Sequence, residues 1–190
     1  MKTSLLCLAL FCSNAALAAS PVQDNANIDS SVAGYKGNVS INQAAGDQQQ
    51  QANVRAIAIG HDAQATTSIQ QSIDTASSRA RDSSASISGN AFSNGSGVLG
   101  INQSAGAGTQ QGNAVRITIS AVPQSIDDSV LFQQNVALSN SSDPTNHAPG
   151  SRQVNTSDQA FTGSRGVVQL NQSAGVGNRM ANTLSIRVAD

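Results

Sequence analysis

Large aromatic side chains are scarce in this sequence: its 190 residues include four phenylalanines, one tyrosine and no tryptophan. A conventional globular core depends heavily on such side chains. The apolar residues are instead mainly alanine, valine and isoleucine, set among many asparagines, glutamines, serines and glycines. This composition favours thin, stacked β-layers over a thick core. A disordered polar chain has a similar composition, but the alternation of β-branched residues described below argues against disorder in the repeated segments.

Cysteine occurs only near the N-terminus, at Cys7 and Cys12. The surrounding segment has the three parts of a secretory signal peptide: a basic Lys2, an apolar run over residues 5–11 and a small-residue cleavage site at residues 16–18. We therefore expect the mature chain to begin at Ala19. Both cysteines would leave with the signal, so the mature chain would have no disulfide and no thiolate.

Glutamate is absent: all 11 acidic residues are aspartates, against 10 lysines and arginines. Loss of Lys2 with the signal would leave a net charge of about −2. Such a chain has no electrostatic reason to bind nucleic acid or anionic lipid. No later segment approaches the roughly 20 apolar residues of a membrane span. We therefore expect no nucleic-acid partner and no transmembrane segment in the mature chain.

Residue types that support catalysis or metal binding are also rare. The two histidines, His61 and His147, lie outside the repeated segments, and His61 has only Asp62 beside it. A single His–Asp pair without a nucleophile is not a catalytic arrangement. Calcium-binding β-roll repeats need glycine and aspartate at short fixed intervals, whereas here Asp47 occurs in one bend and is replaced by Ala107 and Val176 in the others. We predict that the chain is not an enzyme and uses no cofactor or metal.

One block of sequence occurs three times without gaps, over residues 37–60, 97–120 and 166–189. Each copy has an Asn-Gln pair, a bend glycine and a second asparagine at the same spacing. The resulting columns are Asn42, Asn102 and Asn171; Gln43, Gln103 and Gln172; Gly46, Gly106 and Gly175; and Asn53, Asn113 and Asn182. Repetition at a fixed spacing indicates a structural unit that stacks on copies of itself.

Two strands are recognisable in each copy, one on either side of the bend glycine. Apolar residues alternate with small or polar ones, as at Ile57 and Ile59, which indicates strands. The bend would close either a hairpin or an arch whose two strands lie in different sheets, and stacking favours the arch. A third, weaker strand is expected before each copy, over residues 26–32, 85–93 and 154–162, where Val32, Phe92 and Phe161 are equivalent.

The chain is therefore predicted to comprise a signal peptide, three repeats and two linkers. The signal covers residues 1–18, the repeats 26–60, 85–120 and 153–190, and the linkers 61–84 and 121–152. Proline, which cannot donate to a β ladder, is absent from the repeats. The predicted fold is all-β: three imperfect repeats in a β-solenoid or β-arch stack of cross-β type, with irregular linkers.

The amide columns are the predicted self-assembly ladder. Stacking in register would place equivalent side chains about 4.8 Å apart. An amide is both donor and acceptor, so a column of identical amides can form hydrogen bonds along the stack. No charged or proline-rich cap follows Val188, which favours end-to-end addition of further molecules. Five arginines beside the strands are predicted to face solvent and to limit premature aggregation: Arg55, Arg116, Arg165, Arg179 and Arg187.

The repeats resemble those of the functional amyloid subunits of Pseudomonas, the Fap fibre system. The block GVLGINQSAGAGTQQGNAVRI, with the plan of three repeats and two linkers, carries this resemblance over essentially the whole mature chain. It implies a secreted fibre subunit for biofilm matrix or adhesion, exported across the outer membrane, whose partners are its own copies, homologous subunits and the export machinery. The family's major subunit carries a cysteine pair near its C-terminus. Its absence here favours a minor or nucleating subunit, or a related fibre protein, over the major subunit.

Two other functions remain open from the sequence. A periplasmic accessory protein could mimic the repeats and keep fibre subunits soluble. A β-solenoid adhesin could bind carbohydrate on a flat face, although such faces usually present aromatic rings, which this chain almost lacks. Whether the isolated chain polymerises distinguishes these alternatives from the fibre subunit.

Overall fold

The computed structural model describes residues 21–73, 81–122 and 150–189, which contain strands and no helix. Three strands belong to each repeat. The first repeat has β1 (Val22–Asp29), β2 (Lys36–Ala45) and β3 (Gln50–Gly60); the second has β4 (Arg81–Ser88), β5 (Ser96–Ala107) and β6 (Gln110–Ser120); the third has β7 (Arg152–Thr156), β8 (Arg165–Val176) and β9 (Arg179–Ala189).

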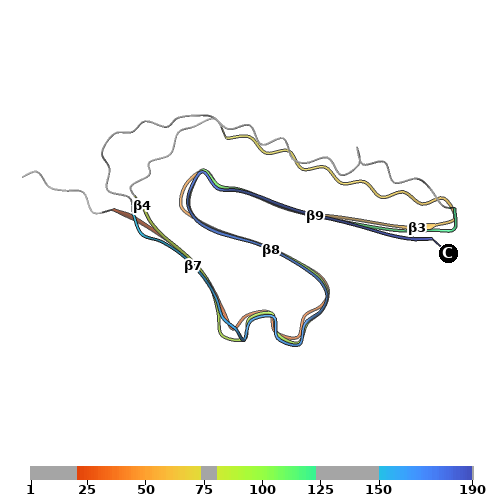
Figure 1. The fold of residues 1–190 in the computed structure, drawn as a ribbon, viewed down its shortest axis with the longest axis horizontal. Helices are drawn as coiled ribbons and strands as arrows, with labels where there is room; N and C mark the ends of the chain where they lie inside the picture. The colour runs from red at the N-terminus through yellow and green to blue at the C-terminus, as the bar shows by residue number, and fades with distance from the viewer. Residues whose placement is uncertain (1–20, 74–80, 123–149, 190) are drawn as a thin grey trace, which may run out of the picture.

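The strands form three parallel sheets, ordered β1-β4-β7, β2-β5-β8 and β3-β6-β9. Each sheet takes one strand from each repeat, so each repeat forms one layer of a three-layer stack. Viewed along the stack, the three layers superimpose and follow the same winding path (Figure 1). The register pairs Asn42 with Asn102 and Asn102 with Asn171. The predicted all-β stack of repeats is confirmed.

The bend after the second strand of each layer is an arch. β2 and β3 are consecutive in the chain, yet they pair within different sheets. The prediction of an arch, rather than a hairpin, is therefore correct. The additional strand of each layer is also present, but β1, β4 and β7 begin earlier than predicted. The segments predicted as their ends instead turn, with Val32, Phe92 and Phe161 in the left-handed region at φ of 59°, 61° and 62°.

The hydrophobic core is small and lies between the β1-β4-β7 and β2-β5-β8 sheets. It contains Ile28, Ile87, Leu99 and Ile101, closed at one end by Tyr35 and Phe92 in the turns. The rings of Phe92 and Phe161 stack with their centroids 5.3 Å apart. Identical positions in successive layers thus pack on each other, and this compensates for the scarcity of aromatic residues.

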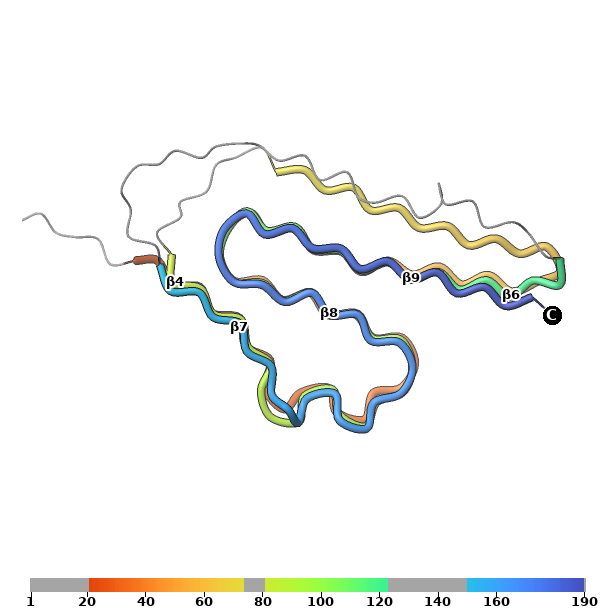
Figure 2. Tube along the Cα trace, viewed as in Figure 1, coloured from red at the N-terminus to blue at the C-terminus, as the bar shows by residue number. Residues whose placement is uncertain are grey.

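Residues 63–73 run back along the outer face of the β3-β6-β9 sheet (Figure 2). Burial alternates along this segment as in a strand, although it belongs to no ladder. Side-chain hydrogen bonds hold it: Gln50 donates to the Ser72 carbonyl and Gln71 to the Gln111 carbonyl. This part of the first linker therefore covers the outside of the stack. The predicted signal peptide, His147 and most of the second linker lie outside the described residues.

Candidate self-assembly site

The first asparagine column lies inside the arch, on the face of β2, β5 and β8 that points toward the third sheet. Asn102 Nδ2 donates to Asn42 Oδ1 over 3.0 Å, and Asn171 Nδ2 donates to Asn102 Oδ1 over 2.9 Å. Asn102 is fully buried. Each amide donates to the layer before it, so the hydrogen bonds of this column all point toward the first layer.

The second asparagine column faces the first from β3, β6 and β9. Asn113 Nδ2 donates to Asn53 Oδ1 over 3.0 Å, and Asn182 Nδ2 donates to Asn113 Oδ1 over 3.1 Å. This column has the same direction as the first. Each member also donates to a backbone carbonyl across the arch, of Ile41, Ile101 and Leu170 respectively.

Within each layer the two asparagines are joined directly, by bonds of 2.8, 3.0 and 2.9 Å in the three layers. The asparagines therefore form a two-dimensional amide network between two sheets. Buried hydrogen bonds contribute about 1 kcal/mol each, whereas a buried donor or acceptor left unpaired costs more. Such a network therefore rejects residues that cannot both donate and accept.

The glutamine column points to the opposite side of the same strands, toward the first sheet. Gln103 Nε2 donates to Gln43 Oε1 over 2.8 Å, and Gln172 Nε2 donates to Gln103 Oε1 over 2.8 Å. Gln103 also donates to the carbonyls of Ala26 and Ser86 in the first sheet. Since neighbouring residues in a strand face opposite sides, the Asn-Gln pair ties the middle sheet to both of its neighbours.

A further amide pair was missed by the sequence analysis. Gln51 donates to Gln111 Oε1 over 3.0 Å and to the Gln43 carbonyl over 2.9 Å, and Gln111 donates to the Gln103 carbonyl over 3.0 Å. The third layer has Met180 at the equivalent place. Only positions identical in all three copies were predicted to form ladders, and this column contains two glutamines and a methionine.

The bend glycines are required by the stacking itself. Gly46, Gly106 and Gly175 have φ of 104°, 127° and 113°, which side chains rarely adopt. A Cβ on Gly106 would lie 1.8 Å from the carbonyl oxygen of Gly175 in the next layer. A Cβ on Gly46 would likewise lie 1.9 Å from the carbonyl oxygen of Gly106. Close approach of successive layers therefore excludes any side chain in this column.

The arginines only partly match the prediction that they face solvent. Arg165 is exposed, whereas Arg116 is 3% exposed and lies on the middle strand, whose outer face residues 63–73 help to cover. The prediction is wrong for Arg116, because a covering linker segment leaves no trace in the repeat pattern. Arg55 donates to the Val39 carbonyl and the Ser40 hydroxyl, and desolvation by burial lowers the pKa of its guanidinium.

Arg81 makes the ion pairs found within the described residues. Its guanidinium lies 2.8 Å from Asp24 in the preceding layer and also contacts Asp47 at the first bend. Arg81 and Asp24 are both buried, so each depends on the other for compensation of its lost hydration. The described residues contain no group of three or more His, Cys, Asp or Glu that could hold a metal ion.

Comparison with known proteins identifies the family. The model of the functional amyloid protein FapB/FapC family matches residues 11–189. The chain belongs to this family. The functional amyloid subunit FapC of Pseudomonas aeruginosa PAO1 is 32% identical over an alignment of 156 residues that covers 78% of this chain and 42% of FapC. The chain therefore spans less than half the length of that FapB/FapC relative. No solved structure matches the chain significantly.

Proposed function

We propose that this chain is a minor or nucleating subunit of an extracellular functional amyloid fibre. In this proposal it assembles by end-to-end stacking of its three-layer unit, so that the amide columns continue from one molecule into the next. The fibre would contribute to biofilm matrix or adhesion. Membership of the FapB/FapC family and the parallel, in-register layers support this assignment.

One observation carries the proposal: the amide columns extend into both end layers. Asn42 donates no hydrogen bond within the described residues, although Asn102 and Asn171 each donate to the layer before them. At the other end of the same column, Asn171 Oδ1 accepts from Asn182 of its own layer and lacks the second donor, from a following layer, that Asn102 Oδ1 has. A donor at one end and an acceptor at the other match when two molecules stack in the same direction.

One feature supports the minor or nucleating role. The mature chain is expected to lack the cysteine pair of the family's major subunit. A nucleating subunit would shorten the lag of the major subunit at substoichiometric amounts. A lag time measured with and without added fibres of this chain tests that role separately from polymerisation itself.

Export and location follow from the predicted signal peptide and the family. The chain would pass through the periplasm and the outer-membrane export machinery to the cell surface, where its partners would be its own copies and homologous subunits. Among the described residues, no helix is long and apolar enough to cross a membrane. Immunogold labelling of intact cells tests the location.

The deciding experiment is fibre formation by the purified mature chain, residues 19–190, followed by fibre diffraction. We expect fibres with reflections at about 4.8 Å along the axis and about 10 Å across it. A chain that stays monomeric for days, both alone and when seeded, would overturn the proposal. That result would favour the periplasmic accessory or the carbohydrate-binding adhesin instead.

A further inference from the structure

The three sheets are not level with one another. β1 contacts both β2 and β5, and β4 contacts both β5 and β8, whereas β7 contacts only β8 of the middle sheet. The third sheet repeats this pattern: of the middle-sheet strands, β3 contacts β2 and β5, whereas β9 contacts β8. The outer sheets are therefore displaced along the stack relative to the middle sheet. β7 and β9 project beyond β8 at one end, and β2 projects alone at the other.

Burial of equivalent residues shows the same displacement. Ala26 and Ala85 are 2% and 0% exposed, but Val154, which continues their column on β7, is 53% exposed. The middle sheet shows the reverse, because Asn171 at one end is buried while Asn42 at the other is exposed. The inner face of β7 thus lacks the cover that its equivalents receive from the following layer of the middle sheet.

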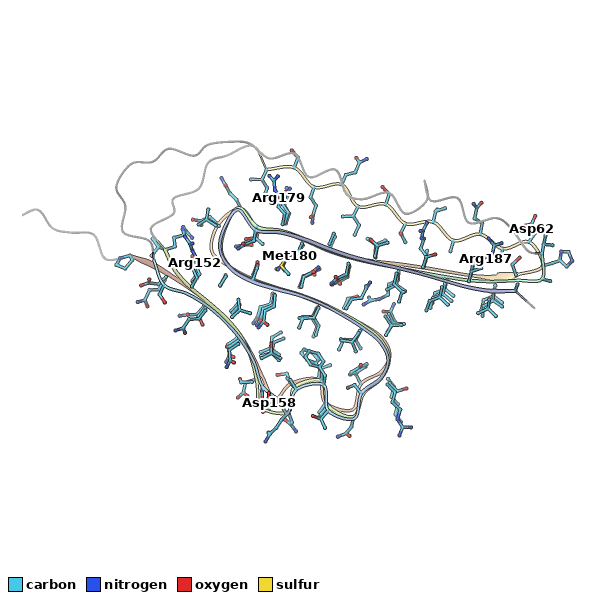
Figure 3. All side chains as sticks on the ribbon, viewed as in Figure 1. Asp62, Arg152, Asp158, Arg179, Met180 and Arg187 are labelled. Atoms are coloured by element: carbon cyan, nitrogen blue, oxygen red, sulfur yellow. The ribbon has the colours of Figure 1, made fainter. Side chains whose placement is uncertain are left out.

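The two end strands of the first sheet, β1 and β7, carry opposite charges in one column. Asp24, Ser83 and Arg152 are successive members of it. Asp24 lies against Gly46 and Arg152 against Gly175, so both charged groups occupy the same place beside the bend. Figure 3 shows Arg152 between β7 and the bend that joins β8 to β9. Arg152 makes no ion pair with any other described residue.

We propose that a second copy of this chain inserts its β2 between the projecting β7 and β9 strands, with its Asp24 and Asp47 carboxylates facing Arg152 of the first copy. This inference rests on the proposed fibre function. Stacking in register places the Cα atoms of Arg152 and of Asp24 in the incoming copy one layer apart, which is about 4.8 Å. That carboxylate would then lie between Arg152 and its own Arg81.

The other charges at this joint are less favourable. Lys36, Ser96 and Arg165 form a column, so stacking places Arg165 over Lys36 of the next copy. Both are exposed, so their repulsion is screened. Arg165 therefore provides a matched control: it is an arginine on the same end layer whose removal should not weaken stacking.

The first test compares seeded elongation by Arg152→Ala and Arg165→Ala. At low salt we expect Arg152→Ala to elongate wild-type seeds about two- to fivefold more slowly than wild type, the range of a partly exposed ion pair. The difference should shrink as NaCl is raised, and Arg152→Lys should recover part of the rate. Arg165→Ala should elongate at least as fast as wild type. Equal rates for Arg152→Ala and wild type at low salt would overturn the ion pair.

The second test measures the register without altering the charges. Asn25, Ser84 and Gln153 form the neighbouring column, and its two end members, Asn25 and Gln153, are exposed. Fibres grown from an equal mixture of Asn25→Cys and Gln153→Cys chains should oxidise to disulfide-linked heterodimers, because Cα atoms one layer apart are within disulfide range. Gln159→Cys in place of Gln153→Cys should not cross-link.

The outcomes separate the two proposals. Failure of the wild-type chain to form fibres contradicts the proposed function. Fibres that form but yield only homodimers, or no cross-link in the mixture with Gln153→Cys, contradict the insertion of β2 between β7 and β9 while leaving a fibre function standing.

Discussion

At the scale of the residue, the difference between an amide and a carboxylate decides whether a column can continue. Asn102 and Asn113 are 0% and 1% exposed and each both donates and accepts. Replacing both with aspartate removes the donors and buries two adjacent charges. We expect elongation of wild-type seeds to slow by more than about tenfold, measured by thioflavin fluorescence, since a buried uncompensated carboxylate costs several kcal/mol.

A matched control for this variant adds the same two negative charges at exposed positions. Asn38 and Asn90 are exposed, so Asn38→Asp with Asn90→Asp should leave elongation within about twofold of wild type. If the Asn102→Asp, Asn113→Asp chain elongated at the control rate, the amide columns would not be what joins the layers.

A substitution of Asn42 tests the joint between molecules more specifically, because within its own molecule the Asn42 side chain accepts hydrogen bonds and donates none to a described residue. Asn102 and Asn53 donate to its Oδ1 over 3.0 and 2.8 Å, and an aspartate would keep both bonds. The missing donor would matter only toward the preceding molecule, where a carboxylate would meet Asn171 Oδ1. We expect Asn42→Asp to keep the β-rich circular dichroism of wild type but to elongate seeds more than about fivefold more slowly. Wild-type elongation would contradict continuation of this column between molecules.

Contacts between side chains of successive layers could be predicted only where all three copies of the repeat have the same residue. Asn42, Asn102 and Asn171 stand out because the repeat keeps one amide at one place, and the structure brings them together. The buried Arg116 could not be predicted in this way. Its environment depends on where the linker folds back, which no repeat column encodes.

At the scale of the element, the bend depends on a glycine for two reasons. Gly106 and Gly177 both have positive φ, of 127° and 72°. Alanine near 72° costs about 1 kcal/mol, whereas 127° lies outside the left-handed region and favours glycine more strongly. Only Gly106 would also place its Cβ against the next layer, whereas Gly177 has nothing within 4 Å. We expect fibres of Gly106→Ala to dissociate at a clearly lower guanidinium concentration than those of Gly177→Ala, which should resemble wild type. Equal midpoints would contradict contact between layers as the reason for this glycine.

The arch was predictable and the limits of the first strand were not. Alternation on both sides of a glycine defines β2 and β3, and stacking decides between an arch and a hairpin. β1, β4 and β7 end before the turns at Val32, Phe92 and Phe161 because these residues adopt positive φ. A β-branched or aromatic residue is an uncommon choice there, so the pattern indicated continued strands.

At the scale of the whole molecule, a head-to-tail stack has two different ends, and two glycines allow each end to be blocked separately. A Cβ on Gly106 points toward the third layer, so the same atom on Gly175 would point toward that end of the molecule. It would also lie 2.8 Å from Cδ of Arg152, whose flexible side chain would have to shift. A Cβ on Gly97 or Gly166 instead lies 2.0 or 2.1 Å from the carbonyl of the preceding layer. The equivalent Gly37 has nothing within 4 Å, so its Cβ would point out of the other end.

Gly175→Ala and Gly37→Ala should therefore act as chain terminators at opposite ends. A Gly175→Ala molecule can dock its intact first layer on the third layer of a fibre, but it then rejects the next molecule. Two-colour fluorescence microscopy of wild-type seeds growing in wild-type chain, with a small fraction of either variant added, measures growth at each end. We expect Gly175→Ala to arrest one end and Gly37→Ala the other, while Gly177→Ala arrests neither. Arrest of the same end by both variants would contradict polar stacking, since the two Cβ atoms lie on opposite faces of the molecule.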